Sequence, residues 1–348
     1  MGGDRVDVAI VGAGPTGLTA AHLCRRLGLS AVVLERREGP QRAPAAHVIN
    51  GRSFEIWRHA GIDLAPILAE ALSPDEAGLA HWAVSLGGEV IGSLPFERQG
   101  VDMLDITPTP LRNLSQHRLE PKLLDDDLDV RYSHRWVRSD EHADGVHVAV
   151  EGPDGEYTID ARYQLAADGA ASGVRRQLGI EMDGPRSLQS FVMVHVAADF
   201  RPLVGDRPGV LWFIVDPASG GTFISHGIDR EWVYMHAWDP DTVPIESFTP
   251  ERFAVAVSAG RLAIRRGRAD AAQFGVALRV GAAVDEVARC AVAGERQRAA
   301  VRLPLPRRHH VGVGHGHPAP QLRVRLAPEP QHRPVIGQPP HPDPGGVR

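Results

Sequence analysis

The sequence predicts an α/β protein in which a strand–helix–strand unit comes first and an antiparallel β-sheet region follows. Residues 6–36 read as a short apolar strand, a glycine turn, a helix and a second strand. Between residues 130 and 239, short alternating segments separated by turn residues are typical of antiparallel strands. A chain of 348 residues is long enough for one large domain or two closely joined ones.

The turn in the first unit has the spacing of a dinucleotide-binding site. Three glycines follow the strand in G-x-G-x-x-G spacing, which permits a tight turn, close approach of a pyrophosphate and close helix packing. Glu35, at the tip of the second strand, is placed to accept hydrogen bonds from an unphosphorylated adenosine ribose. The candidate nucleotide contacts in this unit are Gly12, Gly14, Pro15, Thr16, Gly17, Glu35 and Arg36.

Composition excludes several other classes of protein. The formal charge is -5 and there is no basic face with interleaved aromatic residues, so no nucleic-acid partner is expected. Only Cys24 and Cys290 are present, which argues against a disulfide framework or a thiolate metal site and favours a reduced, cytoplasmic setting. No leader and no membrane-length apolar run is recognised, so no membrane partner is expected. The acidic run 125–127 is expected to be a solvated helix end, and no metal site is predicted.

The segment after Arg36 carries a second pattern. Pro44-Ala45-Ala46-His47 is followed by Asn50-Gly51-Arg52 and Glu55-Ile56, at the start of an expected helix over 52–60. Together with the glycine turn, these residues resemble the class A flavin-dependent aromatic hydroxylases, especially the phenol hydroxylase and chlorophenol monooxygenase branch. The resemblance covers residues 4–258. It implies a Rossmann-like FAD-binding domain and a β-sheet substrate domain, with FAD as cofactor, NAD(P)H as co-substrate and a small aromatic substrate, phenolic or polyketide.

The same resemblance implies further cofactor contacts. Where relatives have an arginine that reaches the flavin, this chain has Ala45, so either Arg42 substitutes or one contact is absent. The added contacts are Arg42, Arg52, Gln116, Asp168 and Gly169. His47 is interpreted as a loop histidine packing under the flavin rather than as a catalytic group. No catalytic base is named, because the resemblance transfers cofactor contacts and not a proton acceptor.

Other elements follow from periodicity and turn residues. A hairpin is expected over 81–96 with Gly87-Gly88 at its turn, and a helix from near Thr109 through 111–125. Strands over 130–168 are expected to form a ribbon laid against the nucleotide unit, followed by a helix capped by Ser172. Three strands are expected within 201–239, then a helix over 249–258. The aromatic residues of these strands and two histidines are expected to be mostly structural: Trp212, Phe213, Phe223, Tyr234, Trp238, His226 and His236.

Composition changes after Gly260. Residues 261–348 contain no Ser, Thr, Lys, Asn, Tyr, Trp or Met and are rich in Arg, Pro, Ala, Gly, Val and His. The preferred interpretation is a shifted reading frame of a GC-rich gene, which leaves a disordered tail and an impaired enzyme. A natural low-complexity tail is the alternative, and a metal site at His309, His310, His315 and His317 is a weaker one.

The expected organisation is an FAD-binding domain over 1–180 with a β insertion around 81–110, a substrate sheet over 181–260, and the tail over 261–348. The expected function is that of an FAD-dependent aromatic monooxygenase. Two alternatives stay open: a flavoprotein dehydrogenase or reductase without oxygen transfer, and a non-catalytic remnant. The oligomeric state stays open between monomer and homodimer.

Overall fold

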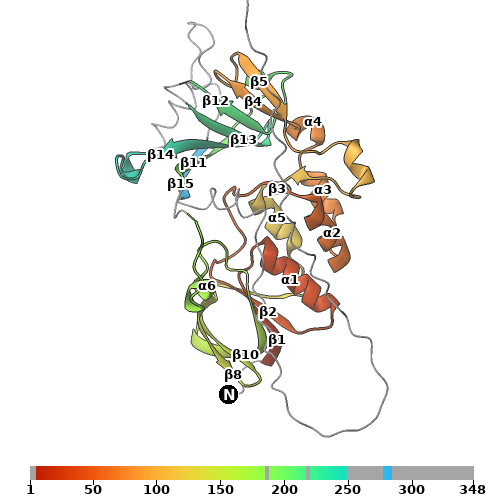
Figure 1. The fold of residues 1–348 in the computed structure, drawn as a ribbon, viewed down its shortest axis with the longest axis vertical. Helices are drawn as coiled ribbons and strands as arrows, with labels where there is room; N and C mark the ends of the chain where they lie inside the picture. Colours follow the sequence, from red (N-terminus) through yellow and green to blue (C-terminus); the bar gives the residue numbers. More distant parts are fainter. Residues whose placement is uncertain (1–4, 185–187, 217–219, 249–276, 284–348) are drawn as a thin grey trace, which may run out of the picture. The chain divides into compact units, whose positions relative to one another are not determined.

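The N-terminal sheet is built around β1 (Arg5–Val11), whose apolar residues are buried from both sides. The computed structural model describes residues 5–184, 188–216, 220–248 and 277–283. The strand order is β7-β2-β1-β10-β9-β8, with β1 paired in parallel to both β2 (Ala31–Glu35) and β10 (Gly155–Ala166) (Figure 1). The carboxyl ends of these parallel strands therefore meet at one edge, where the glycine turn lies.

Helices cover one face of this sheet. α1 (Pro15–Arg26), α2 (Gly51–Ala60) and α5 (Gln116–Leu123) bury apolar side chains against Val8, Ile10 and Val33. Asn50 caps α2 by accepting a hydrogen bond from the Ser53 amide, which fixes the helix start. The expected helix over 52–60 is confirmed.

The ribbon of β8 (Arg135–His142), β9 (Gly145–Gly152) and β10 covers the other face. Its apolar side chains pack with Ala9, Val32 and Leu34, as expected for a ribbon laid against the nucleotide unit. It also continues the sheet, because β10 is hydrogen bonded to β1. The ribbon of strands expected over 130–168 is corrected at its start. Ser133 has a φ of 60°, and the chain divides there into β7 (Asp129–Tyr132) and β8, which lie at opposite edges of the sheet.

The helix expected from near Thr109 begins later than predicted. Residues 112–113 form the short strand β6 (Arg112–Asn113), which pairs with β3 (Val48–Ile49). Extended backbone continues to Ser115, and Gln116 is the first residue of α5. Leu111 and Leu114 have helical spacing but lie in extended backbone. The pairing of β6 with β3 outweighs the local helical preference there.

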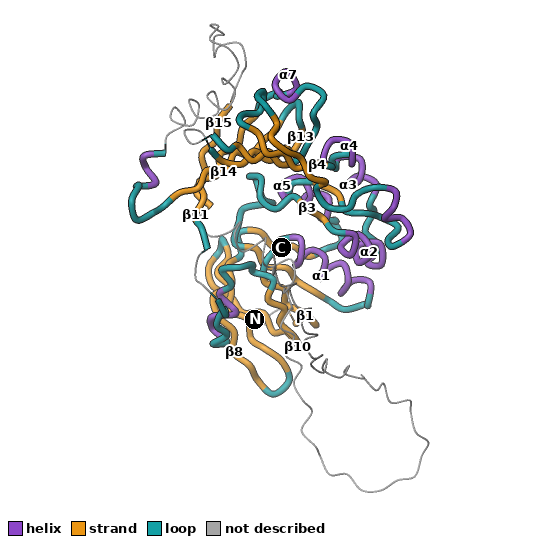
Figure 2. Tube along the Cα trace, turned by 45° about the horizontal axis from the view of Figure 1, so that its top comes forward, coloured by secondary structure: helices purple, strands orange, loops and turns teal. Residues whose placement is uncertain are grey.

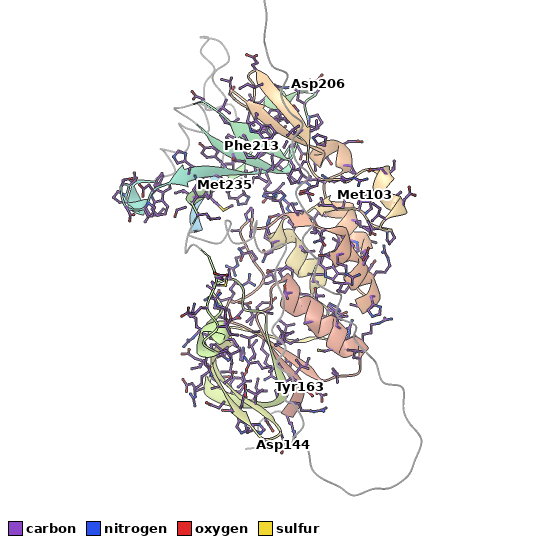
Figure 3. All side chains as sticks on the ribbon, in the orientation of Figure 1. Met103, Asp144, Tyr163, Asp206, Phe213 and Met235 are labelled. Atoms are coloured by element: carbon purple, nitrogen blue, oxygen red, sulfur yellow. The ribbon has the colours of Figure 1, made fainter. Side chains whose placement is uncertain are left out.

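The second sheet has the order β15-β11-β14-β13-β12-β4-β5 (Figures 1 and 3). The three expected strands are β12 (Leu211–Ile214), β13 (Gly221–Gly227) and β14 (Glu231–Trp238), and the expected hairpin is β4 (Leu79–Ala83) with β5 (Val90–Pro95). β11 (Ser190–Ala197) and β15 (Ala277–Ala283) complete it. One pair, β4 with β12, is parallel, which corrects the all-antiparallel expectation: the hairpin joins this sheet from far earlier in the chain.

One face of the second sheet is sealed by a core. Phe200, Phe223 and Trp232 are fully buried there, and Val204 of α7 (Arg201–Val204) packs with them (Figure 2). The expected structural role of Trp212, Phe223 and Tyr234 agrees with their burial in this core. The remaining helices are α3 (Ala65–Glu70), α4 (Pro74–Ala77) and α6 (Gly173–Gln177), with 3-10 turns at Val101–Asp105 and Ile245–Ser247.

The helix expected over 249–258 lies outside the described residues. β15 falls within the predicted tail, and the rest of that tail is also outside the described residues. Within the described part of the chain, no helix combines the length and apolar character needed to cross a membrane.

Candidate functional site

The three glycines of the turn have different surroundings. A Cβ at Gly12, whose φ is 104°, would lie 2.3 Å from the Ala167 carbonyl oxygen, and one at Gly17 would lie 1.8 Å from the Gly12 carbonyl oxygen. At Gly14 the nearest atom would be the Glu120 Oε1, 4.0 Å away. Gly12 and Gly17 therefore hold the helix against the sheet, whereas Gly14 leaves open space at the start of α1.

Pro15 and Thr16 begin α1 as its first two residues. Proline suits this position, because a first-turn amide has no partner within the helix. The Thr19 hydroxyl donates to the Pro15 carbonyl oxygen and accepts from the Trp57 indole N–H, which ties the helix start to α2. The amides of this first turn and the helix dipole favour an anionic group in front of Gly14.

Glu35 is held at the turn by backbone amides. Its Oε2 accepts from the Ala13 amide at 2.9 Å and its Oε1 from the Arg37 amide at 3.0 Å. Burial raises the pKa of Glu35, but the Arg37 side chain and these amides outweigh it, so the pKa lies below its ordinary value. The carboxylate is ionised and fixed at the tip of β2, where a ribose hydroxyl can donate to it.

The arginine that pairs with Glu35 is Arg37 and not Arg36. Arg37 contacts Glu35 Oε1 through its Nε at 3.1 Å and Glu120 Oε2 through its NH1 at 3.2 Å. Arg36, the predicted contact, is exposed. Both arginines follow the end of β2 at Glu35, and of the two Arg37 is the one that is partly buried against Glu35 and Glu120.

Glu120 is a buried acid that the sequence analysis missed. It has no exposed surface; its Oε2 accepts from the Gln41 amide and Arg37, and its Oε1 accepts from the Gln116 side chain at 2.7 Å. Gln116, a predicted flavin contact, is thereby oriented from the first turn of α5. The sequence feature that could have indicated the burial of Glu120 is its place on the apolar side of a predicted helix. An acid in such a place is buried only when basic groups or amides pair with it.

Tyr132 places an unpaired hydroxyl beside this group. It stands opposite Glu35 in the β2–β7 register, and its hydroxyl is buried without a hydrogen-bond partner among the described residues. Burial raises the pKa of the Tyr132 hydroxyl, and the negative charge of Glu120 adds to the rise. A buried, unpaired donor at the adenosine end of the turn fits a bound ligand that accepts a hydrogen bond.

Arg42 and Arg52 are not brought to the turn by any described contact. Arg42 is 80% exposed at its side chain and lies 3.9 Å from Glu38. Arg52 is 76% exposed and pairs with Glu55 on the outer side of α2. Both side chains are exposed, and their roles as FAD contacts stay predictions.

Asp168 and Gly169 follow β10 next to the glycine turn. Asp168 Oδ2 accepts from the amides of Gly173 and Val174, and Ser172 caps the same helix, α6. Asp168 Oδ1 is buried and has no partner among the described residues. Gly169 has a φ of 80°, a conformation that favours glycine. This free carboxylate oxygen fits a donor from a ligand.

His47 is oriented by a chain of amides. The Gln99 side-chain NH₂ donates to the carbonyl oxygens of Ala77 and Phe96, so its Oε1 accepts from the Asn113 NH₂. Asn113 Oδ1 then faces His47 Nδ1 at 3.0 Å and requires a donor there. Neutral His47 therefore carries its proton on Nδ1, and its Nε2 lone pair is an acceptor.

His226 lies edge-on to His47, with ring centroids 5.5 Å apart. It is 6% exposed, and its Nε2 has no partner among the described residues. Burial lowers the pKa of both histidines, and the charge of His47 adds to the lowering at His226. Both rings are neutral near pH 7, and the lowered pKa makes each a weaker base than a free imidazole.

Glu231 connects α5 to the second sheet. Its carboxylate lies 2.7 Å from His195 Nε2 and 3.2 Å from His117 Nε2, and it accepts from Arg118 at 2.7 Å. Burial raises the pKa of Glu231, but the two histidines and Arg118 lower it further, well below its ordinary range. Glu231 on β14 is therefore ionised, and its negative charge acts on His226, where it raises the pKa against the larger lowering by burial.

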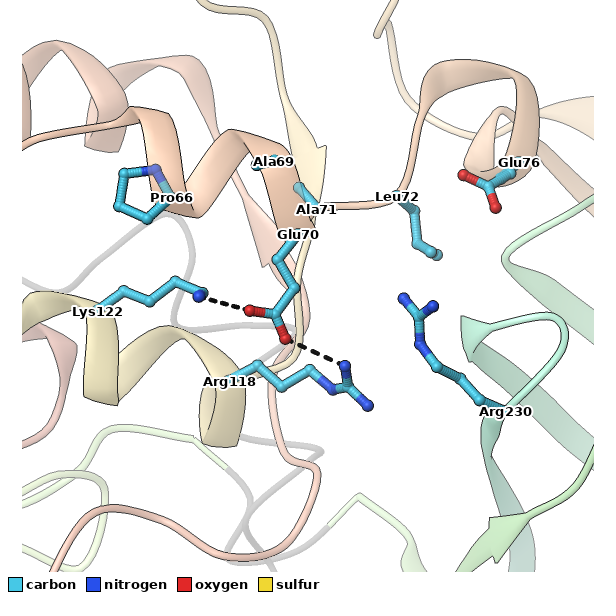
Figure 4. Close-up of a pocket in the computed structure, with 9 residues that line it drawn as sticks. All are labelled: Pro66, Ala69, Glu70, Ala71, Leu72, Glu76, Arg118, Lys122 and Arg230. Carbon is cyan, nitrogen blue, oxygen red and sulfur yellow. Dashed lines mark hydrogen bonds and ion pairs between the residues drawn. The ribbon is translucent and has the colours of Figure 1, made fainter.

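A separate pocket is lined in part by Arg118, which pairs with Glu231 (Figure 4). Glu70 pairs there with Lys122 and with Arg118, and Arg230 projects toward the same space. The pocket contains none of the predicted cofactor residues, and three basic side chains (Arg118, Lys122 and Arg230) and two acidic ones (Glu70 and Glu76) line it. His142, His147 and Asp160 form another polar group, with ligand-capable atoms within 4.8 Å of one another on β8–β10. That group also includes no predicted cofactor residue.

The fold and the turn define a nucleotide-binding α/β protein with an attached β-sheet. The chain belongs to the family described as FAD binding domain, which matches residues 5–268. It is 29% identical over 253 residues to 2,4-dichlorophenol 6-monooxygenase of Delftia acidovorans, covering 67% of this chain and 42% of that protein. It is 32% identical over 265 residues to aklavinone 12-hydroxylase RdmE of Streptomyces purpurascens, covering 72% and 49%.

Solved structures agree with this assignment. The flavin-dependent monooxygenase PieE in complex with FAD and substrate matches with a TM-score of 0.69 and 27% identity, over 80% of this chain and 50% of that one. A ternary complex of aklavinone-11 hydroxylase with FAD and aklavinone matches with a TM-score of 0.68 and 29% identity, over 82% and 54%. The chain spans about half the length of the relatives it matches.

Proposed function

We propose that this chain is the FAD-binding and substrate-sheet part of a monooxygenase that hydroxylates phenolic or other aromatic compounds, polyketides included, with NAD(P)H and O₂. The observation that carries the proposal is the ionised Glu35, held by the Ala13 amide beside the open space at Gly14. A carboxylate for the ribose and a helix start for the pyrophosphate are the two ends of one nucleotide-binding turn. Family membership specifies FAD as the nucleotide.

The residues present fit this cofactor. In the proposal, the backbone from Gly12 to Gly17 holds the pyrophosphate and Glu35 the ribose, while Gln116 and the Asp168-Gly169 turn face the flavin half. The unpaired oxygens of Tyr132 and Asp168 support the fit, because each lacks a partner that a bound ligand can supply. Bound FAD supplies the redox chemistry with NAD(P)H and O₂.

His47 is the proposed proton acceptor for a phenolic substrate. The hydroxyl O–H bond breaks, the proton moves to His47 Nε2, and the electron pair stays on the phenolate oxygen, where it activates the ring toward electrophilic oxygen. The tautomer that this step needs is the one set by Asn113 and Gln99. This proposed role goes beyond the packing role expected from the sequence, which stays a prediction.

Two other functions predict different outcomes. A flavoprotein dehydrogenase or reductase would use the same turn without oxygen transfer, and a binding remnant would lack turnover. A cytoplasmic setting is part of the proposal and is based on the two-cysteine composition. The proposed domain limits at residues 180 and 260 are based on the Asp168-Gly169 turn and on the change in composition after Gly260. The oligomeric state, monomer or homodimer, stays open.

The test starts with the visible spectrum and the flavin content of the purified chain. We expect bound FAD, NAD(P)H oxidation that a phenol stimulates, and a hydroxylated product. NAD(P)H oxidation without product would favour the reductase, and absence of flavin after reconstitution would refute the proposal. The His47→Gln variant should keep FAD and lose the rise in hydroxylation rate with pH, because glutamine cannot accept the proton.

A further inference from the structure

Three side chains that can act as metal ligands come from three neighbouring strands of the N-terminal sheet. His142 is the last residue of β8, His147 lies on β9 and Asp160 lies on β10. His147 is paired with Asp160 on one side and with Asp140, two residues before His142, on the other. Directly paired residues share a face of a sheet, and so do residues two apart on one strand. The three side chains therefore lie on one face, opposite to the buried side chain of Val148.

The ligand atoms of this group lie close to the spacing that a metal ion requires. His142 Nε2 is 3.1 Å from Asp160 Oδ1, and His147 Nδ1 is 3.9 Å from the same oxygen. One ligand atom from each residue lies within 4.8 Å of the other two, and the two imidazole rings are stacked with centroids 4.3 Å apart. Around tetrahedral Zn²⁺, with bonds of about 2.0–2.1 Å, two ligand atoms are about 3.3 Å apart. Side-chain rotations that shift these atoms by about 1.5 Å or less therefore complete the geometry.

The hydrogen bonds around the group leave the ligand atoms available. Asp160 divides its oxygens, because Oδ2 lies 3.8 Å from Arg5 Nε while Oδ1 faces the histidines. The Asp144 amide, in the turn after β8 (Figure 3), donates to His142 Nδ1 at 3.3 Å. The neutral His142 ring thus carries its proton on Nε2 and donates it to Asp160. A metal ion at Nε2 moves that proton to Nδ1, and the only bond given up on the ring is the long, exposed contact with Asp144.

The residue types of the group select the class of metal. Two imidazole nitrogens and one carboxylate oxygen suit Zn²⁺ and the neighbouring divalent transition metals, whereas Mg²⁺ and Ca²⁺ prefer oxygen ligands. The side chains of His142, His147 and Asp160 are 30%, 52% and 31% exposed, so an ion can reach them from solvent. The sequence predicted no metal site, because these ligands come from three strands and no short spacing motif joins them.

We propose that His142, His147 and Asp160 bind one divalent transition-metal ion of the Zn²⁺ type and that water completes its coordination. The ion cross-links β8, β9 and β10 and stabilises the ribbon that is hydrogen bonded to β1. Asp160 lies about 20 Å along β10 from its end at Ala166, next to which the glycine turn is found. The metal site is therefore separate from the proposed FAD site, and its test does not depend on monooxygenase activity.

Calorimetric titration with Zn²⁺ alone tests the site in the full chain, after treatment with EDTA and its removal. A second histidine cluster in the tail is first replaced by glutamine, at His309, His310, His315 and His317. We expect one equivalent of Zn²⁺ to bind with a Kd on the order of 10 µM or tighter, since three ligands supply most of the binding energy of a four-ligand site. Mg²⁺ should not bind there. Absence of Zn²⁺ binding up to about 1 mM would overturn the proposal.

Variants in the same background locate the ion. His147→Gln and Asp160→Asn each remove one ligand and should weaken Zn²⁺ binding at least about tenfold. His59→Gln, which removes an exposed histidine on α2, is the matched control and should leave the affinity unchanged.

Urea unfolding followed by circular dichroism gives a second measurement. Zn²⁺ at ten times the Kd of the parent should raise the folding equilibrium constant of the parent about elevenfold and that of His147→Gln about twofold or less. Unchanged affinity in His147→Gln and Asp160→Asn, or an equal loss in His59→Gln, would refute the site. Stabilisation by Zn²⁺ that is as large in His147→Gln as in the parent would refute it as well.

Discussion

Replacing Gly14 by valine should separate FAD binding from folding. An added Cβ at Gly14 would meet only the Glu120 Oε1 at 4.0 Å, and the backbone there (φ -72°, ψ 178°) is open to any residue. The loss of stability should therefore be about 1 kcal/mol or less, the cost of a poor helix N-cap. The new side chain occupies the space of the pyrophosphate, and losing two charge-assisted bonds to backbone amides lowers FAD affinity on the order of 10²-fold or more.

Gly17, three residues further on, provides a contrast because a side chain there should disturb the fold itself. A Cβ at Gly17 would lie 1.8 Å from the Gly12 carbonyl oxygen, so Gly17→Ala must push α1 away from β1 and should destabilise the fold by about 3 kcal/mol. Gly28→Ala is the surface control: its φ of 72° costs about 1 kcal/mol, but no atom lies within 4 Å of the new Cβ. FAD affinity should then be unchanged.

The assay combines urea unfolding followed by circular dichroism with FAD titration followed by quenching of flavin fluorescence. Gly14→Val should unfold close to the parent midpoint and fail to retain FAD, whereas Gly17→Ala should lose both properties. Stoichiometric FAD in purified Gly14→Val would show that the pyrophosphate does not approach this turn. A large loss of stability in the same variant would show that the open space is not real.

Three further outcomes follow from the site. Ser172→Ala removes the hydroxyl that accepts from the Arg175 amide, so urea unfolding should show a loss of about 1 kcal/mol, and an unchanged midpoint would deny the cap. Glu231→Gln removes the charge that pairs with Arg118 and two histidines, so urea unfolding should show a loss of about 3 kcal/mol in the free energy of unfolding. An unchanged free energy of unfolding would show that Glu231 does not hold α5 to the second sheet. Because the pKa of His226 is lowered in the folded chain, the unfolded chain takes up this proton at a higher pH than the folded chain does. The contribution of His226 to stability is therefore complete above about pH 6.5. Below that pH the free energy of unfolding falls by up to about 1.4 kcal/mol per pH unit. His226→Gln should flatten that part of the stability profile, and an unchanged slope between pH 5 and pH 6.5 would place the protonated group elsewhere.

The parts of the fold that the sequence predicted well are those set by local chemistry. The glycine spacing after β1 specifies its own turn, because only glycine accepts the close contacts at residues 12 and 17. Asn50 and Ser172 are short side chains that satisfy the first amides of their helices, so both starts were predictable. In each case the residues that decide the structure lie within a few positions of one another.

The parts that it did not predict depend on distant partners. Glu120 is buried because Arg37 and the Gln41 amide come to it from about eighty residues away, and no local pattern announces those partners. The start of α5 moved to Gln116 because β6 pairs with β3, again a long-range contact. The choice of Arg37 over Arg36 depends on how the chain leaves β2, which a motif of residue types does not encode.

The nucleotide turn and the proton-accepting histidine are joined through the first turn of α5. The Gln116 amide donates to the Ala46 carbonyl oxygen, and the Leu114 amide donates to that of His47, so the backbone around the histidine is bonded to the segment that starts the helix. From the same helix start, the Gln116 side chain donates to Glu120, the atom group nearest to Gly14. A shift of α5 therefore moves the floor of the pyrophosphate site and the tautomer-fixed imidazole together. The proposed cofactor binding at the turn and the proposed proton transfer at His47 therefore depend on one hydrogen-bonded segment, because neither group can move without breaking the backbone bonds of the other.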